Sequence, residues 1–372
     1  MLKKLFVLII SAALLVSLTA GCAEKSNEKS DRSTMEYVRD FGLGINLGNT
    51  FDCAGDYLKN SDTTGIETAW GSPVITKKMI KGYADGGFGV MRLPVSWTTL
   101  MDGDGNIPKE FIDRIDEVVK WILDSGMCCI LNSHHDGWSE KFEKDYDGAM
   151  QTYEKMWTQI AERFNKYGEN LMFESMNEVG FDNIWNQYGG TNGKKEAYDI
   201  FNAINQKFVD VVRGSGGNNA ERHLLIASYW TSIDRACEDE YILPDDPAGR
   251  LAVSVHYYGP STLTLISEDV SWGKAKTDWG SDEDYAELNM WMDMLSEHFL
   301  YKGIPVIVGE YGCFGENKTR EVREQWMLDV ANAAYSRGAC PVLWDTPGDE
   351  FDRENAVYRR PEFIERLVAI AE

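Results

Sequence analysis

Two glutamates at the ends of apolar segments have the residue type and setting for acid–base and nucleophilic chemistry. Glu178 ends the segment 170–178 (NLMFESMNE), and Glu310 lies within 304–312 (IPVIVGEYG). A charged side chain rarely ends a buried strand unless it is paired, so either glutamate alone could be the partner of a core arginine or a loop amide. Two carboxylates facing each other across one opening would instead suit cleavage of a glycosidic bond, which needs one protonated and one ionised carboxyl group.

Polar or aromatic side chains also stand near the ends of the other strand-like segments. These residues are Arg92, Asn132, His134, His135, Asn177, His256, Tyr258 and Trp344. Arg92 could hold one carboxylate as an anion through a charge-assisted hydrogen bond, and Asn177 could donate a hydrogen bond to a sugar hydroxyl. The two-residue spacing of His256 and Tyr258 places both on one side of an extended strand. Their repetition at one strand end after another indicates a shared site.

The segments that must position these residues alternate between strand-like and helix-like patterns from Phe41 onward. Eight apolar runs predict strands at 41–48, 88–95, 127–135, 170–178, 223–230, 251–258, 304–312 and 340–345. Helix-like patterns occupy 75–87, 109–126, 153–168, 197–216, 284–303, 319–338 and 361–372. The strand candidates are continuous apolar runs, which is typical of a parallel sheet covered on both faces.

Eight such units over residues 36–372 predict an α/β fold, a single (β/α)₈ TIM-barrel catalytic domain with its chemistry at the carboxyl ends of the strands. The competing architecture is a doubly wound open sheet, which usually carries a glycine-rich phosphate loop after its first strand. The corresponding stretch, 42–50 (GLGINLGNT), has glycines at another spacing. No Walker-type motif occurs in the sequence, so the barrel is favoured.

The N-terminus predicts export. Residues 1–21 combine two early lysines, an apolar run and small residues, as a secretory signal does. The ending LTAGC is similar to a bacterial lipobox, which implies cleavage before Cys22, lipid attachment to its sulfur, and an extracellular enzyme on the bacterial surface. Ordinary cleavage and free secretion is the alternative. Residues 22–35 are polar and lack periodicity, so they are interpreted as a flexible tether.

Composition narrows the class of partner. The formal net charge is −23, with 60 acidic and 37 basic residues, so nucleic acid is a poor partner. Neither a CxxC pair nor a His/Cys cluster with zinc spacing occurs, and we expect no metal and no cofactor. Six cysteines besides Cys22 are too sparse for a disulfide scaffold, and their pairing stays open. Twelve tryptophans and seventeen tyrosines could fill a large core or stack on sugar rings.

The motifs that carry these residues resemble those of glycoside hydrolase family 5, and their local residue sequence resembles that of subfamily 4. In chain order they are GLGINLGNTFD, ETAWGSP, GFGVMRLPVSW, LNSHHDGW, MNEV, VHYY, VIVGEYG and VLWD, which together cover the chain from about Phe41 to its C-terminus. The resemblance implies a (β/α)₈ enzyme that cleaves β-glucans with retention of configuration. It implies Glu178 as the acid/base and Glu310 as the nucleophile.

The same resemblance implies roles for the surrounding residues. Arg92 matches the arginine that holds the nucleophile, His134 the histidine of the third strand, and Asn177 the donor to the sugar 2-OH. His256 and Tyr258 match the pair near the two carboxylates. The substrate contacts implied are His135, the platform Trp344 and, in the negative subsites, Asn46 and Trp70. Where the family often has proline after the acid/base, this chain has Val179, and we expect the backbone to bend at Asn177 so that both Asn177 and Glu178 reach the substrate.

The function predicted is therefore that of an endo-β-1,4-glucanase, a monomer with a β-glucan as its partner and contact with a membrane only through the lipid anchor. A xyloglucanase, a lichenase or a mannanase on the same scaffold is the alternative. A sugar-binding lipoprotein without catalysis would lack one of the two rim glutamates, and both are present. A metal hydrolase would need spaced histidines, whereas His134 and His135 are adjacent.

Overall fold

Eight parallel strands close into a barrel in the order β1 to β8. The structure, a computed structural model, describes residues 32–187 and 189–372; the predicted signal peptide and Cys22 lie outside them. The strands are β1 (Gly44–Asn46), β2 (Val90–Leu93), β3 (Cys128–Asn132), β4 (Leu171–Glu174), β5 (Leu224–Ala227), β6 (Leu251–Tyr257), β7 (Val306–Tyr311) and β8 (Cys340–Leu343). Each lies inside one of the predicted apolar runs, so the predicted (β/α)₈ barrel is confirmed.

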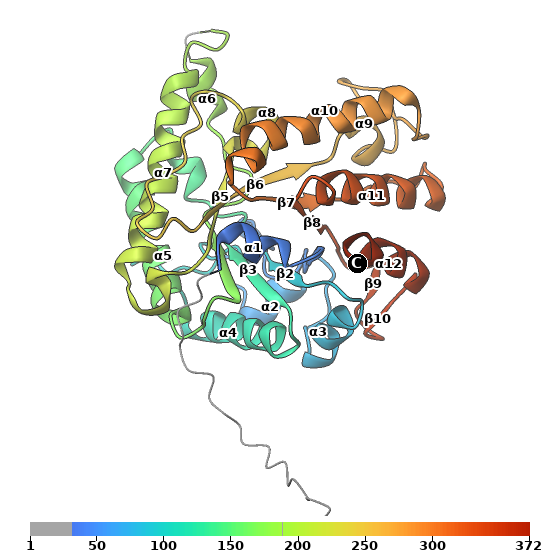
Figure 1. The fold of residues 1–372 in the computed structure, drawn as a ribbon. Helices are drawn as coiled ribbons and strands as arrows, with labels where there is room; N and C mark the ends of the chain where they lie inside the picture. The colour runs from blue at the N-terminus through green and yellow to red at the C-terminus, as the bar shows by residue number, and fades with distance from the viewer. Residues whose placement is uncertain (1–31, 188) are drawn as a thin grey trace, which may run out of the picture. The chain divides into compact units, whose positions relative to one another are not determined.

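Helices surround the strands on the outside of the barrel (Figure 1). They are α2 (Thr63–Thr68), α3 (Lys77–Ala84), α4 (Lys109–Asp124), α5 (Tyr146–Phe164), α6 (Asp182–Asn186), α7 (Lys194–Gly214), α8 (Ile233–Ala236), α9 (Ser261–Thr264), α10 (Asp282–His298), α11 (Arg320–Tyr335) and α12 (Pro361–Val368). Helix α5 begins seven residues earlier than its apolar pattern predicts, because the Asp145 side chain caps it by accepting from Gly148 N. A small antiparallel pair, β9 (Phe351–Asp352) and β10 (Val357–Tyr358), follows β8.

Helix α1 (Thr34–Arg39) lies across one end of the barrel, in front of the strands in Figure 1. Ser33 caps it in a capping box with Glu36. Tyr37 and Val38 pack in one cluster with inward residues of seven strands, namely Val90, Ile130, Met172, Leu225, Ala252, Ile307, Cys340 and Val342. The last residues of the predicted tether, 22–35, are therefore part of the folded domain, a correction caused by this cap and this apolar contact.

A second, larger apolar cluster fills the space between the barrel and its helices. In α4 the side chains of Phe111, Ile115, Val119 and Ile122 are buried at helical spacing, as the sequence predicts. Burying each such side chain contributes about 1.5–3 kcal/mol. These contacts hold the strand ends at fixed positions, which is what a catalytic rim requires.

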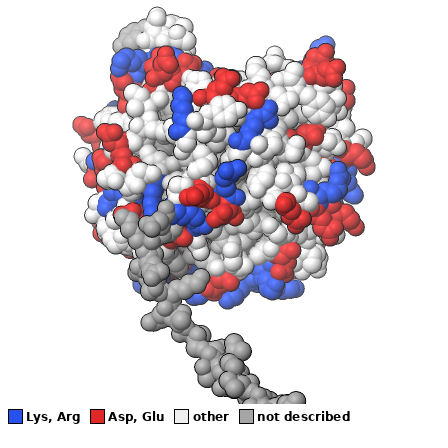
Figure 2. Space-filling view, in the orientation of Figure 1, with Lys and Arg blue, Asp and Glu red and all other residues white. Residues whose placement is uncertain are grey.

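The surface is mixed in charge on the face that carries α1. Figure 2 shows Lys and Arg interspersed with Asp and Glu there, with no broad single-sign area. Among the described residues, no helix has the length and apolar character needed to cross a bilayer. All six cysteines within the described part of the chain are free thiols.

Candidate active site

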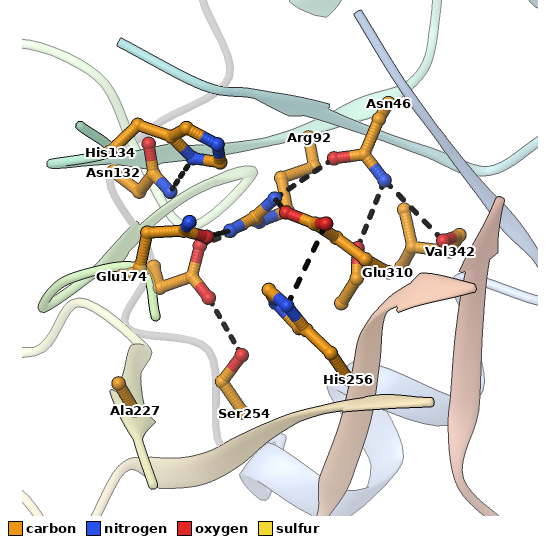
Figure 3. Close-up of polar contacts among 12 residues, drawn as sticks. Asn46, Arg92, Asn132, His134, Glu174, Ala227, Ser254, His256, Glu310 and Val342 are labelled. Atoms are coloured by element: carbon orange, nitrogen blue, oxygen red, sulfur yellow. Dashed lines mark hydrogen bonds and ion pairs between the residues drawn. The ribbon is translucent and has the colours of Figure 1, made fainter. Parts of the chain in front are cut away.

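A buried arginine organises the carboxyl ends of the strands. Arg92, on β2, is fully buried, and its Nε donates to Glu174 Oε2 at 2.7 Å. Its Nη1 donates to Glu310 Oε1 at 2.7 Å and to Asn46 Oδ1 at 3.1 Å. Its Nη2 donates to Asn177 Oδ1 at 2.9 Å. One guanidinium thus connects β1, β4, β7 and the turn that follows β4 (Figure 3).

Glu174 is a structural counterion that sequence reasoning left as a charged strand end. It is fully buried at the end of β4, and its second oxygen accepts a hydrogen bond from Ser254 Oγ at 2.6 Å. Burying a guanidinium is costly unless anions and hydrogen-bond acceptors surround it. The available signal was the carboxylate itself, because a charged side chain in a buried apolar strand needs a partner in the core.

Asn46 differs from its predicted role. The resemblance placed it among the substrate contacts, but its side chain is fully buried. Its Oδ1 accepts from Arg92, and its Nδ2 donates to the carbonyl oxygens of Gly309 at 2.9 Å and Leu343 at 3.2 Å. Because these bonds occupy both ends of the amide, Asn46 orients Arg92 and ties β1 to β7 and β8.

Glu310 lies in a buried pocket with fixed donors on both oxygens. Arg92 contacts Oε1, Tyr258 Oη donates to Oε2 at 3.0 Å, and His256 Nδ1 lies 3.6 Å from Oε2. Burial raises the pKa of Glu310, against the lowering effect of His256 and Arg92. An irregularity in the β6–β7 register makes His256 the partner of Glu310 across the strands, which brings the imidazole to the carboxylate.

Glu178 shares the imidazole of His256 with Glu310. His256 Nδ1 lies 2.8 Å from Glu178 Oε1, and the Glu178 side chain is 42% exposed. Burial acts to raise the pKa of Glu178, but the hydrogen bond and charge of His256 outweigh it and the net pKa is lowered. Oxygen atoms of Glu178 and Glu310 and a nitrogen of His256 all lie within 4.8 Å of one another.

This separation decides what the carboxylates can do together. Retaining glycosidases have their two carboxyl groups about 5–5.5 Å apart, whereas inverting ones leave roughly 6.5–9.5 Å for a water molecule. An oxygen-to-oxygen distance within 4.8 Å suits a carboxylate that attacks directly. The three ligand atoms also have the spacing to hold a cation, but the Arg92 guanidinium already neutralises Glu310 at 2.7 Å.

The pKa values of the two carboxyl groups are shifted in opposite directions, but in the order opposite to the one that acid catalysis by Glu178 needs. Burial raises the pKa of Glu310, and His256 lowers that of Glu178. The hydrogen bond from His256 therefore opposes protonation of Glu178. A glycosidic oxygen that takes the place of His256 beside Glu178 would remove this opposition.

Aromatic side chains form the walls beside the carboxylates. The rings of His134 and Trp344 are stacked with centroids 5.8 Å apart, and burial lowers the pKa of His134 well below its usual value, which keeps it neutral. Trp70 and His135 lie 5.8 Å apart, centroid to centroid, and both line a cleft of about 1010 Å³. Tyr57, which sequence reasoning missed, accepts a hydrogen bond from Trp70 Nε1 at 2.8 Å.

A buried network behind Trp344 fixes its indole. A Cβ added to Gly48 would lie 2.8 Å from the Trp344 ring, so the indole packs directly on that glycine. Arg353 Nη2 donates to the carbonyl oxygens of Gly48 at 2.8 Å and Asp345 at 3.3 Å. Tyr83 Oη donates to the Asp345 carboxylate at 2.6 Å. Arg353 lies ten residues after the end of β8, so its position in the sequence does not predict its contact with the segment around Trp344.

The backbone leaves the strand before Glu178, as predicted. β4 ends at Glu174, and residues 177 and 178 form a bend. Asn177 N donates to Ser133 O at 2.9 Å, and Val179 O accepts from Trp230 N at 2.8 Å. The bend lets the Asn177 amide face Arg92 while Glu178 faces His256.

Comparison with known proteins agrees with this geometry. The family model described as Cellulase (glycosyl hydrolase family 5) matches residues 54–349. The chain is 33% identical over 318 residues to "Endoglucanase A" of Clostridium longisporum, a match covering 85% of this chain and 60% of that protein. The chain thus spans less than two thirds of that relative's length.

Solved structures share the whole described fold. A "GH5-4 broad specificity endoglucanase" from an uncultured bovine rumen ciliate superimposes with a TM-score of 0.82 at 33% identity, covering 91% of this chain and 98% of that chain. A glycoside hydrolase 5 lichenase from Caldicellulosiruptor sp. F32, a point mutant in complex with cellotetraose, gives a TM-score of 0.83 at 30% identity, covering 92% of this chain and 96% of that chain.

His256→Asn should move both limbs of the pH profile of kcat/KM to higher pH. His256 lowers the pKa of Glu178 and that of Glu310, so its removal raises both, and the profile of the free enzyme follows the pair. The measurement is kcat/KM against pH for the variant and for His298→Asn, a control on the outer helix α10. Limbs that stay in place, or that move to lower pH, would contradict the assignment.

Proposed function

The chain belongs to the cellulase family, glycosyl hydrolase family 5, and on that premise we propose that it is a retaining endo-β-1,4-glucanase that hydrolyses internal bonds of β-glucans. The observation that carries the proposal is the pair Glu178 and Glu310, whose oxygens lie within 4.8 Å across the rim. The endoglucanase and lichenase names of similar proteins support a β-glucan as substrate.

In the first step, Glu310 attacks the anomeric carbon and forms a glycosyl ester. The bond between that carbon and the leaving oxygen breaks, and Glu178 gives its proton to the leaving oxygen. In the second step, Glu178 takes a proton from water as the water attacks the same carbon. The ester bond breaks, Glu310 returns as a carboxylate, and the sugar leaves with its original configuration.

Neighbouring residues have roles that follow from their contacts. Arg92 and Tyr258 fix the two oxygens of Glu310 for in-line attack and stabilise the carboxylate when it is released. Asn177 uses its carbonyl oxygen on Arg92, which leaves its NH₂ group as a donor for the sugar 2-OH. His134 and Trp344 form the stacked wall beside the cleavage point, and Trp70 and His135 contact sugars further along the cleft.

Catalysis in this proposal needs no metal ion. Arg92 supplies the positive charge beside Glu310, at 2.7 Å, that a metal would otherwise supply. Substrate choice among cellulose, mixed-linkage glucan, xyloglucan and mannan depends on the loops that line the cleft. We favour β-1,4-linked and mixed-linkage glucans, because the similar solved structures bear the names endoglucanase and lichenase.

The enzyme acts outside the cell in this proposal, held by a lipid on Cys22. The leader 1–21 and the lipobox-like LTAGC support this anchor.

A bacterium expressing the chain should incorporate labelled palmitate into the protein, and Cys22→Ser should lose the label and release the enzyme from the membrane fraction. Label that persists in the variant would exclude Cys22 as the lipidated residue.

Glu310→Gln and Glu178→Gln should each lower kcat/KM on barley β-glucan by at least about 10³-fold, because each removes one group of a two-carboxylate mechanism. The fold should survive, since glutamine keeps the size and the hydrogen-bonding oxygen of each side chain.

The activity of the wild-type enzyme should resist EDTA, and proton NMR should detect the β-anomer of the product first. Full activity in Glu310→Gln, or an α-anomer as first product, would refute the mechanism.

A further inference from the structure

The end of β5 has an unusual backbone. Trp230 and Thr231 both adopt left-handed conformations, with φ of 55° and 47°. Bulky and β-branched residues rarely do so, and such strain persists where surrounding contacts impose it, often beside a functional site. Trp230 is nevertheless 43% exposed and lines the cleft that contains Glu178. Neither residue belongs to the machinery described above.

Trp230 contacts the turn after Glu178 in three ways. Its backbone N donates to Val179 O at 2.8 Å, and its indole Nε1 donates to Asp182 Oδ1 at 3.1 Å. The indole also covers Gly180 so closely that a Cβ added there would lie 2.2 Å from Nε1. The left-handed backbone is what allows the peptide N–H and the indole of one residue to reach the same turn.

The neighbouring side chain strengthens this attachment. Phe181 N donates to Tyr229 Oη at 2.6 Å. Tyr229 is almost fully buried, and its ring packs against Phe181, Trp185, Tyr198 and Phe201. The end of β5 is thus anchored in the core and bonded to residues 179–182.

The other side of the turn is attached to β3, where Asn177 N donates to Ser133 O at 2.9 Å. The peptide of Glu178 therefore lies between two backbone hydrogen bonds, one to the end of β3 and one to the end of β5. Its side chain is 42% exposed and contacts His256 at 2.8 Å. That contact uses only Oε1, so the direction of the other carboxyl oxygen depends on the backbone that carries the side chain.

We propose that Trp230 is a positioning residue for Glu178: its peptide and indole hold the Val179–Gly180 turn so that the Glu178 proton is aimed at the leaving oxygen. The inference rests on the proposed function and adds a residue to it. It also explains how this chain fixes the turn although it has Val179 at the position where the family often has proline. A glycine at position 180 is required because the indole occupies the space of any side chain there.

Gly180→Ala tests this directly, because φ of Gly180 is outside the left-handed region and the three atoms nearest to an added methyl group all belong to the indole. The substrates are phenyl β-cellobioside, whose leaving group needs a proton, and 2,4-dinitrophenyl β-cellobioside, whose leaving group departs without one. We expect kcat/KM to fall at least about 10-fold for the phenyl substrate and no more than about 3-fold for the dinitrophenyl substrate. Trp230→Gly, which suits a left-handed backbone, should give a loss of the same kind.

Controls separate this role from general damage. Gly214→Ala, at the end of α7 with nothing within 4 Å of the added Cβ, should match the wild type on both substrates. The double variant Gly180→Ala/Trp230→Gly should resemble Trp230→Gly alone, because the clash is gone. Equal losses on both substrates, or no loss in either single variant, would overturn the inference. A wild-type enzyme that cleaves neither the cellobiosides nor barley β-glucan would instead refute the proposed function, and the inference with it.

Discussion

The buried charge of Arg92 is the constraint on which the catalytic rim depends. A guanidinium without access to water must have anions and acceptors around it, and here they come from Glu174, Glu310, Asn46 and Asn177. Removing one partner of a buried ion pair costs about 3–5 kcal/mol, since the remaining charge is left uncompensated. The geometry of the proposed nucleophile, Glu310, is therefore fixed by the same interactions that hold several strand ends together.

Glu178, the proposed acid/base, is positioned differently. The Glu310 side chain is 7% exposed and bonded on both oxygens, whereas that of Glu178 is 42% exposed and contacts His256. A nucleophile gains from rigidity, because it attacks one carbon along one line. An acid/base must exchange its proton twice, with the leaving oxygen and then with water, so greater access suits its role. His256 joins the two by facing both carboxylates from β6.

The fold and the pairing of the two rim glutamates follow from the sequence because burial and alternation leave a direct pattern in it. All eight strands lie within predicted runs, and Arg92, Glu178 and Glu310 converge as their positions at strand ends require. Patterns of this kind cannot tell whether a polar side chain at the rim faces substrate or protein. Asn46 was therefore assigned to the substrate, while Glu174 was left without a role.

Other features depend on contacts between residues far apart in the chain. The packing of the Trp230 indole on Gly180 connects the segment after β5 to the turn after β4. A tryptophan with a left-handed backbone conformation has no signature in the local sequence. Arg353 donates a hydrogen bond to Gly48, which lies 305 residues earlier in the sequence. The early start of α5 and the packing of α1 depend on caps and contacts within polar stretches that lack an apolar period.

The central claim, that Glu310 is the nucleophile held by Arg92, is tested most directly by trapping the covalent intermediate. The protein is incubated with 2,4-dinitrophenyl 2-deoxy-2-fluoro-β-cellobioside, whose fluorine slows both steps while its leaving group still departs. Mass spectrometry of the intact chain should then show one added fluorocellobiosyl group, and peptide mapping should locate it on Glu310. A label on any other residue, or release of dinitrophenol without a labelled protein, would contradict the account.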